Sequence, residues 1–389
     1  MLADPHSGIA RATGDLAAGL AGAGHEVHAL ADGSAARAGA APGVTVHHIA
    51  GTGLLDRAAA VRDTLAGLHA MRPIDIALAP LWGCEGVLAQ RDGRYPLVVS
   101  CMTSSTTLAA IDGSATGPEG REAILLERAT LRDARHLHGL TRAAVERTLA
   151  EYPGAPLTVG VVGRGLRDRT PAGHPAQRSA NPDRVEILFI GRLEPRKGID
   201  VLLDAVCALV DEGLDVGLTV VGPGDSQDSH GARFRARATP ATTARVRFAG
   251  PVRAAELDRL LAGADVVCQP SRYESHGVVL LEAMMFGKAI VTTSAGGIPE
   301  VVEDGGNALL ARPGDTASLV RELRAAVSSD ELRRRLGARS RERYLERFGL
   351  DAVTRGMVEL FESAVAAHHA AARATRRPAA RDPRGSRGG

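Results

Sequence analysis

The chain has 389 residues, which exceeds one ordinary hydrophobic core and favours two domains of about 150 to 200 residues each. Hydrophobic residues make up 44% and charged residues 24%, a composition that excludes collagen-like and low-complexity folds. No apolar run approaches the roughly 20 residues of a membrane helix, and the first residues lack the pattern of a secretory signal, so we expect a cytoplasmic protein.

The net charge of +2 is unevenly distributed along the chain. Residues 373–389 hold six arginines and one aspartate, which leaves 41 basic and 44 acidic residues, or −3, in the rest. Aromatic residues are only 3%, and no basic stripe is interleaved with them, so we expect no nucleic-acid partner. Residues 1–167 carry 15 basic and 16 acidic residues, which does not favour peripheral membrane contact.

The first half of the sequence alternates predicted helices with short apolar strands, an alternation that indicates a parallel sheet. We predict helices at 9–24, 57–71 and 122–152, and strands at 26–30, 44–49, 74–79, 97–101 and 158–162. Residues 1–167 are therefore interpreted as a Rossmann-like domain. Residues 168–184 contain three prolines and little to bury, so they are predicted to form a linker.

The second half repeats this alternation more clearly. Strands are predicted at 185–190, 216–222, 246–250, 265–270, 289–293 and 307–311, with helices at 198–212, 254–263, 277–286, 315–328 and 330–347. Residues 185–350 thus form a second doubly wound α/β domain, followed by a helix at 351–372 and a disordered tail at 373–389. We expect the two Rossmann-like domains to face each other across a cleft.

Two segments that follow strands of the second domain carry the candidate chemistry. In 191–200, Arg192 and Lys197 emerge where open α/β sheets bind ligands, and two cations beside a helix N-terminus are suited to a diphosphate. Only Lys197 and Lys288 are lysines among 47 basic residues, so Lys197 stands out in a chain that otherwise uses arginine. The competing interpretation of 191–200 is a solvated charged loop.

The second segment, 271–290, contains Glu274 in a loop, Gly277 and Val278 at a helix start, and Glu282 one turn later. Such a helix start offers backbone amides to phosphate, and Glu282 could accept hydrogen bonds from hydroxyl groups. The chain holds three glutamate pairs at this spacing, and only this pair lies in a strand, loop and helix context. The prediction of a binding site at Glu274 and Glu282 therefore rests on this strand, loop and helix context.

These two segments, with VVGPGD, VRFAGPV and the N-terminal PHSGIARATGDLAAGLAGAGHEV, resemble glycosyltransferase family 4, retaining enzymes of the GT-B fold. The resemblance is strongest over 185–312 and weak over 40–165. It implies that Arg192 and Lys197 neutralise the donor diphosphate and that Glu274 contacts the sugar near the reacting carbon. It also implies that the amides of Gly277, Val278 and Val279 bind the donor. Glu282 would bind the ribose, and Gly8 would lie under the diphosphate.

The residue types fit transfer from a nucleotide-diphosphate sugar, with a uridine diphosphate sugar favoured. Fixed cations and helix amides stabilise a departing diphosphate, and the cleft segments contain no Asp-x-Asp, so we expect no metal or other cofactor. The acceptor would be a small molecule or glycan. A non-hydrolysing sugar-nucleotide epimerase and a non-catalytic sugar-nucleotide-binding protein are the alternatives.

Three positions depart from the family pattern or bear on the acceptor. The usual Pro-Asn-Gly before the linker reads Gly163-Arg164-Gly165, and the aromatic before the helix glycine is His276, a plain loop residue or a sugar contact. Trp82 and Glu85 follow a strand of the first domain and could touch an acceptor, although a buried tryptophan and a solvated glutamate explain them equally well.

The start of the chain carries a further expectation. In a Rossmann-like domain of this kind, a central strand leads into the N-terminal glycine loop, but here only Met1-Leu2-Ala3 precedes that loop. A sheet without this strand would leave backbone groups unpaired. We therefore expect an apolar strand encoded upstream of Met1, with a short strand at 1–3 as the alternative.

Overall fold

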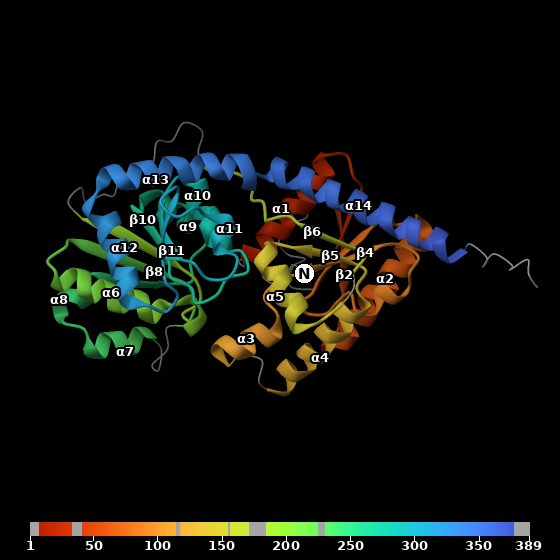
Figure 1. Cartoon of the computed structure of the whole chain (residues 1–389), viewed down its shortest axis with the longest axis horizontal. Coiled ribbons are helices and arrows are strands. Elements are labelled where there is room, and N and C mark those ends of the chain that lie inside the picture. Colours follow the sequence, from red (N-terminus) through yellow and green to blue (C-terminus); the bar gives the residue numbers. More distant parts are fainter. Residues whose placement is uncertain are drawn as a thin grey trace, which may run out of the picture.

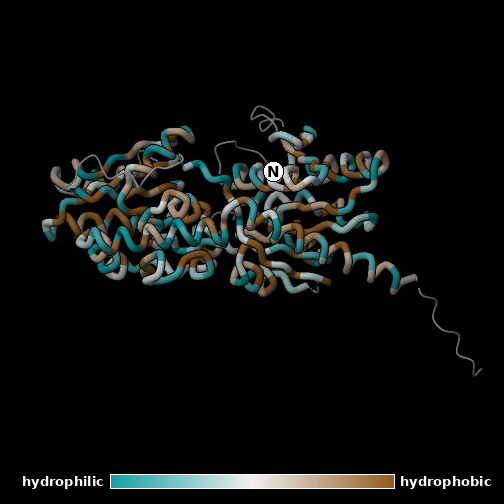
Figure 2. Tube along the Cα trace, turned by 90° about the horizontal axis from the view of Figure 1, so that it is seen from above, coloured by the Kyte–Doolittle hydropathy of each residue, from teal (hydrophilic) through white to brown (hydrophobic). Residues whose placement is uncertain are grey.

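The computed structural model describes residues 8–32, 41–113, 117–154, 156–170, 184–224 and 230–376. The chain forms two α/β halves that lie side by side (Figure 1). Hydrophobic segments run through the interior of both halves, and hydrophilic segments lie toward the outside (Figure 2). None of the helices in the described ranges is long and apolar enough to cross a membrane.

The first half contains parallel strands covered by helices. Its elements are α1 (Gly8–Gly22), β1 (Val27–Asp32), β2 (Val44–Ile49), α2 (Leu54–Met71), β3 (Ala77–Pro80), η2 (Ala89–Arg91), β4 (Leu97–Cys101), α3 (Ser105–Asp112), α4 (Pro118–Asp133), β5 (His136–Gly139), α5 (Arg142–Glu151) and β6 (Thr158–Val161). Strands β1 and β2 pair with each other, and β3 to β6 form a parallel sheet in chain order. The strand considered at 1–3 lies outside the described residues.

The second half is a six-stranded parallel sheet in the order β12-β11-β10-β7-β8-β9. Its elements are β7 (Val185–Ile190), η3 (Pro195–Lys197), α6 (Ile199–Asp211), β8 (Val216–Val221), α7 (His230–Arg237), α8 (Pro240–Thr243), β9 (Val246–Gly250), α9 (Ala254–Gly263), β10 (Val266–Gln269), α10 (Val278–Met285), β11 (Ala289–Thr293), α11 (Ile298–Val301), β12 (Ala308–Ala311), α12 (Thr316–Ser328) and α13 (Asp330–Arg343). The strands are nearly continuous apolar runs because helices cover both faces.

The C-terminal segment returns the chain to the first half. After α13, a π-helical turn, η4 (Tyr344–Phe348), leads into α14 (Leu350–Arg376). Helix α14 contacts α1 and β6, and it runs along the first half in Figure 1. The Tyr344 hydroxyl donates to the Leu166 carbonyl oxygen at 2.7 Å, which ties the turn to the end of the first half.

Three predictions of secondary structure need correction. The helix predicted at 122–152 is divided into α4 and α5 by β5, whose sequence His-Leu-His-Gly is buried but carries little apolar signal. Helix α3 was not predicted from the sequence. Helix α14 continues to Arg376, so residues 373–376 of the predicted disordered tail are helical, and 377–389 lie outside the described residues. Most of the predicted linker, 171–183, also lies outside them.

The four cysteines differ in their burial. Cys84, Cys101 and Cys268 are buried, Cys207 is partly exposed, and all four are free. Burial raises the pKa of the Cys84 thiol to about 12, so this thiol stays protonated and inert near neutral pH.

Candidate active site

The candidate site lies at the point where the second sheet reverses its strand order. The chain enters at β7, adds β8 and β9 on one side, and then places β10 on the other side of β7. Ligands of open α/β sheets bind at such a switch point, outside the carboxyl ends of the strands. The loops that follow β7 and β10 are the two segments singled out in the sequence.

A close backbone approach joins these two loops. Gly198 connects η3 to α6 with φ +71°, and a Cβ atom there would lie 1.9 Å from the Pro270 carbonyl oxygen. The Arg272 amide donates to the Arg196 carbonyl oxygen at 2.7 Å. Only glycine fits position 198, and its fit brings Lys197 beside the loop after β10.

Glu274 is the centre of the cluster formed by the two loops. Its Oε1 pairs with Lys197 Nζ, accepts from Ser271 Oγ at 3.1 Å, and lies 3.6 Å from Arg196 Nη1. Burial alone would raise the pKa of Glu274, but the charges of Lys197 and Arg196 outweigh it and lower the pKa. Glu274 is therefore ionised, and it can accept hydrogen bonds but cannot donate a proton.

Arg196 is a member of this cluster that sequence reasoning missed. Its buried guanidinium pairs with Glu194 at 2.7 Å and donates to the Tyr273 carbonyl oxygen at 3.2 Å. Its position next to Lys197 in the segment 191–200 is the sequence feature that could have identified it. Arg192, which the sequence did single out, lies in the same loop with a side chain 65% exposed, and its Nε is 3.2 Å from Glu194.

Helix α10 directs its N-terminus into the same region. Gly277 caps the helix with φ +90°, and Val278 and Val279 form its first turn, in which backbone amides have no intrahelical acceptor. A backbone hydrogen bond holds the loop before this helix in place, because the Gly297 amide donates to the Glu274 carbonyl oxygen at 2.8 Å. The expected amide donors and Glu274 thus come from one continuous turn.

Glu282 lies one turn further along α10 and is buried. Its Oε1 is 2.8 Å from Arg11 Nη2 and 3.3 Å from Arg169 Nη2. Burial raises the pKa of Glu282, and the two arginines oppose that shift. Arg11 belongs to α1, which begins at Gly8, so the start of the first helix faces the donor half across the interface. Neither arginine was associated with Glu282 from the sequence.

Arg164 and His276 lie together between the halves. Arg164 Nη2 is 3.4 Å from Met102 Sδ, and no carboxylate among the described residues forms an ion pair with its guanidinium. His276 is buried edge-on against Phe348, and its Nδ1 has no partner among the described residues. Burial lowers the pKa of His276 to about 3, so the ring is neutral, and burial lowers the pKa of Arg164 to about 10, so it stays charged. The departure at Gly163-Arg164-Gly165 therefore places a cation between the two halves, beside His276.

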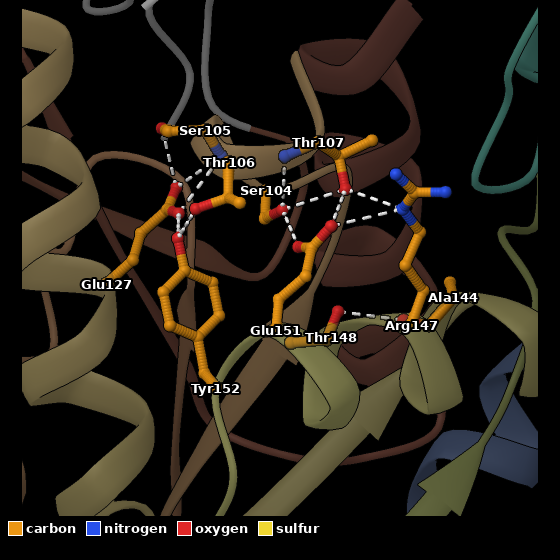
Figure 3. A network of polar contacts seen from close by, with 10 residues as sticks. All are labelled: Ser104, Ser105, Thr106, Thr107, Glu127, Ala144, Arg147, Thr148, Glu151 and Tyr152. Carbon is orange, nitrogen blue, oxygen red and sulfur yellow. Dashed lines mark hydrogen bonds and ion pairs between the residues drawn. The ribbon is translucent and has the colours of Figure 1, made fainter. Parts of the chain in front are cut away.

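A network of polar side chains supports α3 in the first half (Figure 3). Glu127 is buried and accepts from the Ser105 amide and hydroxyl at 2.9 and 2.8 Å and from the Tyr152 hydroxyl at 3.0 Å. Burial raises the pKa of Glu127, and the hydrogen bonds from Ser105 and Tyr152 oppose that shift. The carboxyl group therefore holds the first turn of α3 in place.

The other side of the network reaches the second half. Glu151 accepts from Thr107 Oγ1 at 2.7 Å and from Arg147 Nε at 3.1 Å, as Figure 3 shows. The Arg147 guanidinium lies 5.0 Å from the centre of the Tyr273 ring, next to Glu274 in sequence. The network thus joins α3 and α5 to the loop that carries the donor cluster.

Two further contacts hold the halves against each other. Thr141 Oγ1 donates to the Ser275 carbonyl oxygen at 2.8 Å. The amides of Arg142 and Ala143, at the start of α5, donate to the two carboxylate oxygens of Glu300, each at 2.8 Å. A carboxylate of one half therefore caps a helix of the other, which is the favourable end of the helix dipole for a negative charge.

Trp82 and Glu85 do not match the structural alternatives considered for them. Trp82 is 45% exposed, so it is not a buried core residue, and Glu85 is only 8% exposed, so it is not a solvated surface residue. Between them, Gly83 and Cys84 adopt positive φ values of +85° and +55°. The loop after β3 is thus tightly wound, and it presents Trp82 outward.

Lys288 serves a different purpose from Lys197. It is buried on the far side of α10, and its Nζ donates to the Ala262 carbonyl oxygen at 2.6 Å. Burial lowers the pKa of Lys288 to about 8. Of the two lysines of the chain, only Lys197 belongs to the candidate site.

Comparison with known proteins agrees with this geometry. Residues 174–343 match the model of glycosyl transferases group 1, and residues 7–165 match that of the glycosyl transferase 4-like domain. A D-inositol 3-phosphate glycosyltransferase of Saccharomonospora viridis is 31% identical over 298 residues, which cover 74% of this chain and 69% of the relative. One from Streptomyces bingchenggensis is 29% identical over 305 residues, which cover 75% and 67%.

Solved structures share the fold. A sucrose-phosphate synthase from Thermosynechococcus elongatus is similar with a TM-score of 0.72 and 21% identity, covering 90% of this chain and 92% of that one. Anabaena HepE in complex with UDP-glucose is similar with a TM-score of 0.71 and 21% identity, covering 90% and 95%. The two sheets, the switch-point site and these matches together show that the chain belongs to the glycosyltransferase family 4 type of GT-B glycosyltransferases.

Proposed function

We propose that this glycosyltransferase is a cytoplasmic, retaining hexosyltransferase that uses a UDP-sugar and needs no metal ion. The observation that carries the proposal is the meeting of Lys197, Glu274 and the N-terminus of α10 at the switch point. Support for the donor comes from Anabaena HepE, a neighbour in fold whose structure contains UDP-glucose. The acceptor is a hydroxyl group of a small molecule or glycan.

The proposed reaction follows from the charges of the site. As the bond between the sugar C1 and the diphosphate oxygen breaks, negative charge grows on the diphosphate, where Lys197, Arg192 and the α10 amides stabilise it. The acceptor oxygen bonds to C1 on the face that the diphosphate leaves, and its proton passes to the departing phosphate oxygen. Glu274, held ionised by Lys197, accepts hydrogen bonds from the sugar and stabilises positive charge near C1.

The acceptor is proposed to bind on the first-half side, near α3 and the loop that carries Trp82 and Glu85. Inositol 3-phosphate is the first acceptor to test, because the relatives at about 30% identity are named for it. The Arg164 guanidinium, which has no ion-pair partner in the part of the chain that the structure describes, supports an anionic group on a substrate between the halves.

Proton NMR of UDP-glucose incubated with the protein, EDTA and inositol 3-phosphate tests the proposal. The expected product has an α-glycosidic anomeric signal, and UDP is released in step with it. An inverted product, or activity lost in EDTA and restored by manganese, would overturn the mechanism. A new nucleotide sugar formed without acceptor would instead indicate an epimerase, and donor binding without turnover across an acceptor panel would indicate a binding protein.

The role proposed for Glu282 predicts a separate effect on nucleotide affinity. Glu282→Gln is expected to weaken UDP binding about tenfold in calorimetric titration and to change kcat little, because a ribose contact is made in both the ground and transition states. Arg11→Gln is the matched control, since it breaks the same ion pair and leaves the glutamate in place. Unchanged UDP affinity in Glu282→Gln would remove Glu282 from the ribose.

A further inference from the structure

A pocket lies at the amino-terminal ends of strands in the first-half sheet. It has a volume of about 380 Å³ and is lined by Leu97 and His136, the first residues of β4 and β5. The strands of this sheet are parallel, so their amino ends face away from the loops that follow β4 and β5 and line the cleft. His368 of α14 closes the pocket from the side of the C-terminal helix.

Three polar atoms of pocket residues lack partners. Gln90 Oε1, the Tyr95 hydroxyl and His136 Nε2 are buried and have no hydrogen-bond partner among the described residues. Tyr95 is 4% exposed and His136 is 1% exposed. Buried polar atoms normally have partners because leaving them without one costs free energy. These three atoms belong to residues that line one pocket, and the described residues leave them without partners.

The His136 and Gln90 side chains are each held by a hydrogen bond at their other polar atom. His136 Nδ1 is 2.9 Å from Thr158 Oγ1, and Gln90 Nε2 donates to the Thr130 carbonyl oxygen at 3.0 Å. The His136 ring also lies beside that of His368, with the ring centres 6.1 Å apart. The histidine and the glutamine are thus held with their second polar atoms directed away from these bonds.

The charged residues of the pocket favour an anion. Arg91 Nε donates to Asp133 at 2.9 Å, so these two charges compensate each other, whereas Arg135 is exposed and adds a positive charge. Arg135 lies close enough to both histidines for its charge to lower their pKa values, in addition to burial, and the pKa of His136 falls to about 4. A neutral His136 beside a cation suits a ligand that carries both hydroxyl groups and a negative charge.

We propose that this pocket binds a small hydroxylated anion, whose charged group contacts Arg135 and whose hydroxyl groups bond to Gln90, Tyr95 and His136. The ligand would contact His368 on one side and the start of β4 and β5 on the other. Binding therefore fastens the last turns of α14 to the first half. This inference does not depend on the donor or acceptor proposed for the cleft.

Glycerol 3-phosphate is the probe for the test, with glycerol and inorganic phosphate as probes that carry the hydroxyl groups alone or the charge alone. The full chain is first saturated with UDP to occupy the cleft. Glycerol 3-phosphate is then expected to shift the His136 side-chain nitrogen signals saturably in NMR and to slow hydrogen exchange in the last turns of α14. Glycerol and phosphate should each bind at least about tenfold more weakly.

Two variants and one control assign the binding to the pocket. Tyr95→Phe removes only an unpartnered hydroxyl, and Arg135→Gln removes only an exposed charge, so both should fold and each should weaken glycerol 3-phosphate about tenfold. Arg128→Gln changes an exposed arginine of α4 outside the pocket and should have no effect. The proposal is overturned if His136 shows no saturable shift at millimolar probe, if inorganic phosphate binds equally well, or if both variants bind like the wild type.

Discussion

Lys197→Met is expected to lower kcat by about 100-fold or more while the protein stays folded. In the proposed mechanism the ammonium group stabilises charge that develops on the leaving diphosphate, and its ion pair with Glu274 holds that carboxylate in its ionised form. Glu274 keeps Ser271 and Arg196 nearby, so the variant retains partners for the buried carboxylate. The measurement is kcat with saturating donor, alongside a thermal melt.

Lys288→Met is the matched control, because it removes the chain's other lysine, which is buried and bonds to the Ala262 carbonyl oxygen, away from Glu274. It should keep nearly wild-type kcat. Arg192→Ala removes the second cation, whose side chain is largely exposed, and should lower kcat to a similar extent at unchanged stability. Retention of more than about a tenth of wild-type kcat by Lys197→Met would show that Lys197 does not act on the diphosphate.

Gly198→Ala is expected to lower the free energy of unfolding by about 2 to 5 kcal/mol, from the left-handed backbone and from overpacking together. The new Cβ would lie 1.9 Å from the Pro270 carbonyl oxygen, so the loops after β7 and β10 must separate. Because Lys197 precedes this glycine and Glu274 follows Pro270, the same movement should reduce activity. Urea unfolding and kcat measure the two effects.

Gly213→Ala separates backbone strain from crowding. Gly213 has φ +84°, close to that of Gly198, but nothing lies within 4 Å of the position that its Cβ would occupy. It should cost only about 1 to 2 kcal/mol and leave activity unchanged. Equal losses of stability in the two variants would mean that the contact with Pro270 does not position the loops.

The second half was largely predictable from the sequence because its strands are buried on both faces. The runs at 185–190, 246–250 and 289–293 coincide with β7, β9 and β11, since helices on both sides favour uninterrupted apolar residues. The loops between strand and helix then follow, which is why Lys197, Glu274 and Gly277 come together as expected. A local pattern was sufficient for this part of the site.

Other parts depend on contacts that no local pattern reveals. Strand β5 is buried, yet its two histidines bond to distant partners, Ser100 and Thr158, and its composition does not indicate a strand. The pairing of Glu282 with Arg11 joins residues from different halves of the chain. Trp82 and Glu85 have exposures opposite to those that hydropathy suggests, because the loop winds through two residues with positive φ.

The most direct test of the proposed donor site is a calorimetric comparison of UDP and UMP in the presence of EDTA. In the proposed site, Lys197, Arg192 and the amides of α10 hold a diphosphate, so the second phosphate should contribute much of the affinity. We expect UDP to bind at least about 100-fold more tightly than UMP, and Lys197→Met to remove most of that difference. Equal affinities for UDP and UMP, or a preference that depends on added divalent metal, would contradict the diphosphate site.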